Sequence, residues 1–144
     1  MIAKPSATGL DAAPHDPSED ARRLRVLIVE DEHILAMELE TLLEELDVEI
    51  VGFAASAAEA EALVEMARPD CMTMDVNING ERDGLYTAQQ IFDRFGVRSI
   101  FISGYADPAT HERAEQCQAI GWIRKPVDKS QLIEVLGRAR RLGH

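Results

Sequence analysis

The sequence of 144 residues has little cysteine, few basic residues and no long apolar run. Its two cysteines, Cys71 and Cys117, lie far apart, which argues against a disulfide framework and against a zinc knuckle. Lys and Arg number 15 against 26 Asp and Glu, and this net charge of −11 argues against a free-standing nucleic-acid binder, because neutralising phosphates requires a basic face. No apolar run approaches the roughly 20 residues that span a bilayer, and the N-terminus lacks the apolar core of a secretory signal. We therefore expect an acidic cytoplasmic domain with neither nucleic acid nor a membrane among its partners.

The chain does contain enough apolar sequence for one ordinary domain, since 46% of its residues are hydrophobic and 28% are charged. Residues 1–23 differ from the rest, because they contain Pro5, Pro14 and Pro17 and show no hydrophobic period. This composition predicts a flexible N-terminal extension, followed by a single domain over residues 24–144.

From Arg25 onward, short apolar segments alternate with segments of helical period. The apolar segments predict five strands, at residues 26–29, 49–54, 71–75, 99–103 and 121–124. Apolar residues between the strands recur at three- and four-residue spacing, which predicts helices with these residues on one face: Leu35, Leu39, Leu42, Leu43 and Leu46; Leu85, Ala88, Ile91, Phe92 and Phe95; Leu132, Val135, Leu136, Ala139 and Leu142. Ser56 and Asp107 are predicted N-caps, and Pro108 is the predicted first residue of its helix.

Five strand–helix units in succession predict an α/β fold, in which helices cover both faces of a parallel sheet as a three-layer sandwich. Five strands favour the flavodoxin-like (βα)5 arrangement with strand order 2-1-3-4-5. In that order the first and third strands are neighbours, and ligands bind beyond their carboxyl ends.

Residues suited to metal and phosphate chemistry follow these strands at their carboxyl ends. Glu30 and Asp31 end the first strand, Asp75 ends the third, Ser103 ends the fourth and Lys125 follows the fifth. Three carboxylates in one cleft need a cation to stay ionised, and hard oxygen ligands suit Mg²⁺ or, alternatively, Mn²⁺. With the metal, the lysine and the serine can hold a phosphoryl group, while Asp75 can attack it as a nucleophile.

These residues carry a resemblance over residues 25–142, about four-fifths of the chain. The chain resembles the receiver domain of bacterial two-component response regulators, in its stand-alone, single-domain form. The matching segments are Val26-Leu27-Ile28-Val29-Glu30-Asp31-Glu32, Met74-Asp75-Val76-Asn77, Asp83-Gly84, Ser103-Gly104 and Lys125-Pro126. Each segment is a weak match by itself, but five in order, each on its expected element, make a specific pattern.

The resemblance implies a metal site and a phosphoacceptor. Asp75 would take a phosphoryl group from a phosphohistidine on a histidine kinase or a phosphotransfer protein. Asp31 and Asp75 would bind Mg²⁺ directly, the backbone carbonyl of Asn77 would be a third ligand, and Glu30 would act through water.

The resemblance also implies the groups that respond to phosphorylation. Ser103 would move in to hydrogen-bond a phosphoryl oxygen, and Lys125 would pair first with Asp75 and then with the phosphoryl group. A cis peptide before Pro126 would position the lysine. Either Trp122 or Tyr105 would be the switch aromatic.

The sequence departs from the common receiver pattern in the loop 77–84, which lacks the usual proline and is one residue longer. Gly104 follows Ser103, where alanine is more usual. The segment Phe101-Ile102-Ser103-Gly104-Tyr105 resembles the Phe-Ala-Thr-Gly motif of an atypical receiver subgroup. Members of that subgroup often lack the aromatic residue of the fifth strand, yet Trp122 stands there.

We therefore expect a non-enzymatic signalling switch whose output is contact with an unknown downstream protein, or a protein that relays the phosphoryl group onward. No room for a DNA-binding domain is expected after Leu142, so the output face would comprise the helix at residues 108–119, the fifth strand and the last helix. That helix has few large apolar residues, which suits an element that moves. A degenerate receiver acting as a constitutive interaction module is the alternative, and a monomer and a homodimer both stay open. An aspartyl-phosphate phosphatase fits poorly, because such enzymes generally carry the nucleophile on the first strand.

Overall fold

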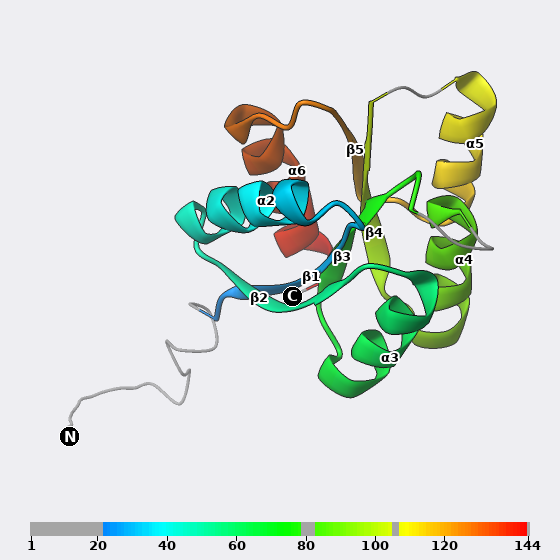
Figure 1. Cartoon of the computed structure of the whole chain (residues 1–144), viewed down its shortest axis with the longest axis horizontal. Coiled ribbons are helices and arrows are strands. Elements are labelled where there is room, and N and C mark those ends of the chain that lie inside the picture. Colours follow the sequence, from blue (N-terminus) through cyan, green and yellow to red (C-terminus); the bar gives the residue numbers. More distant parts are fainter. Residues whose placement is uncertain (1–21, 79–82, 105–106, 144) are drawn as a thin grey trace.

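The structure is a computed structural model that describes residues 22–78, 83–104 and 107–143 (Figure 1). Strands and helices alternate along these residues. The strands are β1 (Leu24–Val29), β2 (Val48–Ala54), β3 (Cys71–Asp75), β4 (Arg98–Ser103) and β5 (Gly121–Arg124). The helices are α2 (His33–Glu45), α3 (Ala57–Ala67), α4 (Gly84–Phe95), α5 (Pro108–Gln116) and α6 (Lys129–Gly143). Among the described helices, none is both long enough and apolar enough to cross a membrane.

The strands form one parallel sheet in the order β2-β1-β3-β4-β5, which confirms the predicted flavodoxin-like topology. Three strands begin one or two residues earlier than the apolar pattern indicates. At β1 the reason is cross-strand pairing, because Leu24 pairs with Val48 and Arg25 with Glu49. Backbone hydrogen bonds in the ladder extend a strand through polar residues that the hydrophobic pattern does not mark.

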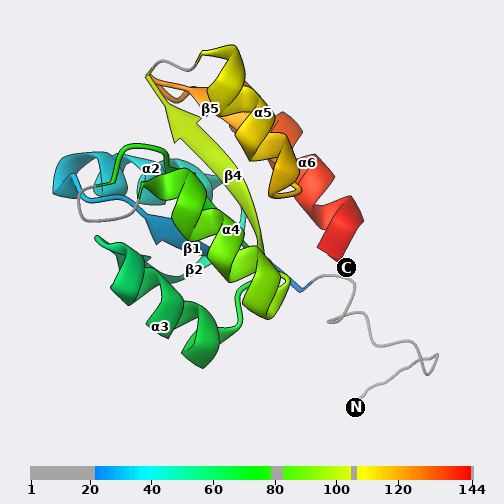
Figure 2. The same cartoon turned by 90° about the vertical axis from the view of Figure 1, so that its right-hand side faces the viewer.

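Two helical layers cover the sheet (Figures 1 and 2). Helices α2 and α6 pack on one face through a core that includes Leu39, Leu43, Leu132 and Leu136. Helices α3, α4 and α5 contribute to the core on the other face, which contains Phe101. Alternate residues of each strand enter opposite cores, as the two-residue period of a strand requires.

The predicted helix caps are confirmed, since the side chain of Ser56 accepts from the N–H of Glu59 and that of Asp107 from the N–H of Thr110. The predicted boundary of the helix at 108–119 is wrong by three residues. Helix α5 ends at Gln116, because the backbone of Gln118 turns into the left-handed region with φ 59°.

Leu142 lies in the apolar register of the last helix but is 56% exposed. The period of the helix continues to that position, but Ala139 is the last residue of α6 found in the core among those whose burial is described. A helical pattern shows which residues share a face and does not show where the neighbouring sheet stops.

Gly84 begins α4 at a point where the chain passes directly over the end of β3. A Cβ atom at this position would overlap the carbonyl oxygen of Asp75 and lie 2.8 Å from the Cα of Val76. The N–H of Gly84 donates to the carbonyl oxygen of Val76 at 2.9 Å. A residue with no side chain therefore lets α4 start against the backbone of the predicted phosphoacceptor.

Candidate functional site

Three carboxylates meet at the carboxyl edge of the sheet, where the sequence predicts them. Glu30 directly follows β1, Asp31 comes next, and Asp75 is the last residue of β3. One oxygen of each lies within 4.8 Å of the others. Glu30 and Asp75 are buried, with 8% and 3% exposure, whereas Asp31 is half-buried. The order β2-β1-β3 makes these strands neighbours and so brings together residues 45 positions apart.

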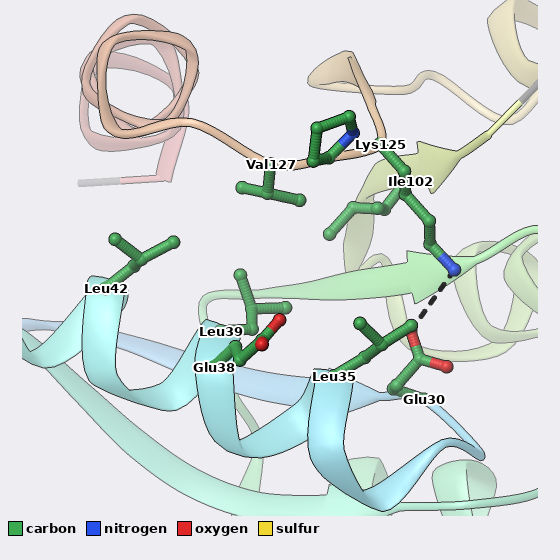
Figure 3. Close-up of a pocket in the computed structure, with 9 residues that line it drawn as sticks. Glu30, Leu35, Glu38, Leu39, Leu42, Ile102, Lys125 and Val127 are labelled. Atoms are coloured by element: carbon green, nitrogen blue, oxygen red, sulfur yellow. Dashed lines mark ion pairs between the residues drawn. The ribbon is translucent and has the colours of Figure 1, made fainter.

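The ammonium group of Lys125 lies between two of these carboxylates. Its Nζ atom is 3.6 Å from Oε1 of Glu30 and 3.6 Å from Oδ1 of Asp75 (Figure 3 draws the pair with Glu30). One ammonium group cannot balance three ionised carboxylates, so the cleft favours a further cation. Closely spaced carboxylate oxygens, with Asp31 open to solvent, fit the ligand preference of Mg²⁺.

Glu30 has a strongly altered ionisation equilibrium. Burial raises the pKa of its carboxyl group, a hydrogen bond with Asp75 and the charge of Asp75 raise it further, and the result is about 7 instead of 4.5. The N–H of Glu32 and the charge of Lys125 oppose this rise. Excess negative charge is therefore costly in this cleft, which is the condition under which binding a divalent cation is favourable.

Backbone donors hold two of the carboxylates in place. The N–H of Asn77 donates to Oδ1 of Asp75 at 3.0 Å, and the N–H of Glu32 donates to Oε2 of Glu30 at 3.1 Å. The side chain of Asn77 is exposed, just beyond the end of β3. The loop after β3 thus touches the predicted phosphoacceptor through its backbone.

Ser103 and Lys125 lie on adjoining strand ends. Ser103 is the last residue of β4 and is fully buried, and its carbonyl oxygen accepts from the N–H of Lys125 at 2.8 Å. The peptide bond between Lys125 and Pro126 is cis, as the resemblance implies. The side chain of Lys125 reaches into the cleft between Glu30 and Asp75.

The two candidate switch aromatics are Tyr105 and Trp122. Tyr105 lies outside the described residues. Trp122 is half-buried on β5, with its ring centroid 5.7 Å from that of Phe101 and 4.2 Å from that of His111 on α5. His111 carries no pattern in the sequence, and no local signal could have linked it to a strand eleven residues further on.

A pocket of about 360 Å³ adjoins the carboxylate cleft between α2 and the segment after β5 (Figure 3). Glu30 and Lys125 lie at one end of it, and Leu35, Leu39 and Val127 contribute much of its apolar wall. The cleft is therefore continuous with an apolar surface along α2.

Comparison with protein families gives a match to the model described as the response regulator receiver domain, over residues 26–137. The chain is 33% identical over 123 residues to the transcriptional regulatory protein PdtaR of Mycobacterium tuberculosis, covering 85% of this chain and 60% of PdtaR. It is also 33% identical over 110 residues to the phyllosphere-induced regulator PhyR of Methylorubrum extorquens, covering 75% of this chain and 41% of PhyR. The chain thus spans less than two thirds of the length of these curated relatives.

Among solved structures, the chain is similar to the signal receiver domain of a modulated diguanylate cyclase from Desulfovibrio desulfuricans G20. The TM-score is 0.76 with 30% sequence identity, and the match covers 83% of this chain and 94% of the other. In this comparison nearly the whole of the neighbouring domain is matched.

Proposed function

The chain belongs to the family of response regulator receiver domains, and we propose that it is a cytoplasmic switch controlled by phosphorylation of Asp75. Phosphorylation-dependent switching is the general role of receiver domains in two-component systems, and such domains are generally non-enzymatic. They interact with histidine kinases or phosphotransfer proteins and with downstream proteins. In this proposal the donor is a phosphohistidine of such a protein.

The observation that carries the proposal is the contact of Lys125 with both Glu30 and Asp75, each at 3.6 Å, within a cluster of three carboxylates. In the proposed transfer, a carboxylate oxygen of Asp75 attacks phosphorus while the phosphorus–nitrogen bond of the donor breaks. The ammonium group of Lys125 then pairs with the new phosphoryl group, because it already lies beside the attacking carboxylate.

Metal binding is assigned in this proposal to Asp31, Asp75 and the backbone carbonyl of Asn77, with Glu30 acting through water. Bound Mg²⁺, or Mn²⁺ in its place, would neutralise charge on the phosphoryl oxygens. Ser103 would donate a hydrogen bond to a phosphoryl oxygen. Trp122 and Tyr105 remain the two candidates for the aromatic residue that reports this event.

The proposed output is contact with a downstream protein, through α5, β5 and α6. Both curated relatives named above are regulators, and they are longer than the match, so the activity of a whole relative does not transfer to this chain. The alternative, a receiver that binds partners constitutively, differs in requiring no phosphoryl group at Asp75.

Incubation of the full chain with acetyl phosphate and Mg²⁺, followed by intact mass measurement, tests the proposal. We expect one added phosphoryl group, which is absent when EDTA removes the metal and absent in Asp75→Asn. Glu49→Gln, a change to an exposed acid outside the cleft, should leave the yield unchanged. If neither acetyl phosphate nor a phosphorylated donor protein modified the wild type, the switch proposal would fail and the constitutive module would be favoured.

A further inference from the structure

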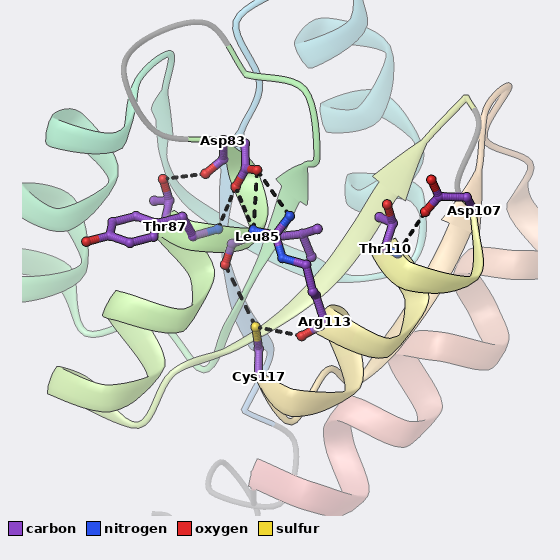
Figure 4. Close-up of polar contacts among 8 residues, drawn as sticks. Asp83, Leu85, Thr87, Asp107, Thr110, Arg113 and Cys117 are labelled. Carbon is purple, nitrogen blue, oxygen red and sulfur yellow. Dashed lines mark hydrogen bonds and ion pairs between the residues drawn. The ribbon is translucent and has the colours of Figure 1, made fainter.

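Helix α5 buries little apolar surface, and polar contacts of Arg113 and Cys117 link it to the start of α4 (Figure 4). Among its nine residues Ala114 alone is buried, and the buried Cys117 follows the helix end. The thiol of Cys117 lies 3.8 Å from the carbonyl oxygen of Leu85, and the ring of His111 contacts Trp122. A further contact is an ion pair between Arg113 and Asp83. A helix with so few anchors can change position at low cost.

Asp83 is the N-cap of α4 and lies beside the phosphorylation site. Its Oδ1 accepts from the N–H of Tyr86 at 2.7 Å, while the guanidinium of Arg113 reaches both of its carboxylate oxygens at 3.4 Å. The next residue, Gly84, packs directly against the carbonyl oxygen of Asp75. Asp83 is therefore a single residue away from direct contact with the backbone of the phosphoacceptor.

We propose that the Asp83–Arg113 ion pair couples the backbone at Asp75 to α5 and opens when Asp75 is phosphorylated. Asp83 and Arg113 act as positioning residues. The coupling that they provide between Asp75 and α5 involves neither Ser103 nor Trp122. This inference rests on the proposed function. Gly84 packs against the backbone of Asp75 and Val76, so a backbone shift there on phosphorylation of the Asp75 side chain would be passed to the start of α4.

The ion pair suits a contact that opens reversibly. The side chains of Arg113 and Asp83 are 49% and 48% exposed, and their separation of 3.4 Å is long for a charged hydrogen bond. Exposed ion pairs of this kind add little to stability. A weak contact favours one position of α5 without fixing it. A modest structural change at Asp75 is then sufficient to shift the equilibrium between the positions of α5.

Amide hydrogen exchange of α5 in the full chain tests the inference, with and without Mg²⁺ and beryllofluoride, a stable mimic of the phosphoryl group. In the unmodified protein, Arg113→Gln should speed exchange in α5 about two- to fivefold, the range that an exposed ion pair permits. With beryllofluoride bound, wild type and variant should exchange alike, because the pair is already open. By linkage, the variant should bind beryllofluoride about two- to fivefold more tightly.

Matched variants separate the pair from general charge effects. Asp83→Asn keeps an N-cap oxygen for Tyr86 but removes the charge, so it should act like Arg113→Gln although it changes net charge in the opposite sense. Arg113→Lys should restore most of the wild-type behaviour. Lys129→Gln removes a similarly exposed ion pair, the one with Glu45, and should leave the amide exchange of α5 unchanged.

The outcomes distinguish this inference from the proposed function. If wild type binds beryllofluoride but the Arg113 and Asp83 variants behave like wild type, the coupling proposal is wrong. The coupling proposal would also be wrong if the variants accelerated amide exchange in α5 equally with and without beryllofluoride, because a purely structural contact affects both states alike. If wild type itself fails to respond to beryllofluoride and to acetyl phosphate, the proposed function is wrong.

Discussion

Helices α5 and α6 precede and follow β5, the edge strand of the sheet, yet they are attached to it very differently. Helix α6 has 15 residues and buries Leu132, Val135, Leu136 and Ala139 against the sheet. Helix α5 has nine residues and buries Ala114 alone. Burial of apolar side chains sets how much free energy holds a helix in place, so α6 is a fixed part of the core and α5 is the adjustable one.

The charged contacts of the two helices follow the same division. Lys129 of α6 pairs with Glu45 of α2 at 3.2 Å, in addition to an apolar face that already fixes the helix. In α5, the Arg113–Asp83 pair accompanies only one buried helix residue, Ala114, and the contact of His111 with Trp122 among the described residues of the helix. An ion pair of similar strength therefore has more influence on the position of α5.

Among the changes that compare α5 with α6, truncating a core-facing side chain of α6 should have the largest effect on the free energy of unfolding. Leu136→Ala removes a fully buried side chain and should lower the free energy of unfolding by about 3 kcal/mol. Leu142→Ala, on the same helix but 56% exposed, should change it by less than about 0.5 kcal/mol. Urea denaturation followed by circular dichroism measures both. Similar losses for the two variants would contradict the placement of the core boundary at Ala139.

The two cysteines report separately on the two helices, because Cys71 lies in the core shared with α6 and Cys117 follows α5. Burial raises the pKa of Cys71 to about 12 and also raises that of Cys117, so both thiols are largely protonated at pH 8 and react when local opening exposes them. Alkylation by iodoacetamide at pH 8 should modify Cys117 at least about tenfold faster than Cys71, since movement of α5 suffices to expose it.

Denaturant supplies the control for the thiol experiment, because both cysteines should react at similar rates in the unfolded chain. Raising the pH should speed both reactions, because a larger fraction of each exposed thiol is then ionised to the reactive thiolate. Mass spectrometry of the digested protein reads each site. Equal native rates for the two thiols would indicate that α5 opens no more readily than the core beneath α6.

A change within α5 should lower global stability less than Leu136→Ala does. Ala114→Gly removes a buried methyl group and lowers helix propensity, which together should cost about 1 to 2 kcal/mol. The rate of amide hydrogen exchange in α5 should rise, while the rate in α6 should stay near its wild-type value in native conditions. If α6 amides accelerated as much as those of α5, the two helices would open together and the comparison would fail.

Much of the candidate site follows from the sequence, because strand ends can be located from short apolar runs. Glu30, Asp31 and Asp75 were expected at adjacent strand ends and their oxygens do converge within 4.8 Å. Lys125 was expected beside Asp75 and lies 3.6 Å from it. The roles of these residues, and those of Ser103 and Asn77, remain predictions.

Other features could not be read from the sequence, because they depend on contacts between separate elements. Asp83 and Arg113 are 30 residues apart, and neither belongs to a pattern that names the other. His111 belongs to no sequence pattern, yet its ring lies against Trp122. Leu142 continues the apolar period of α6 but lies past the edge of the core.

The sequence by itself determined the order of strands and helices, the parallel sheet and the edge where the carboxylates meet. These features follow from residue periods of two and 3.6 and from the rule that parallel strands end at one edge. The tertiary structure decided which helix is firmly held and which is not. It also decided that Asp83, next to the backbone of Asp75, meets Arg113 of α5. Packing distances between elements set those contacts, and no local pattern along one element encodes them.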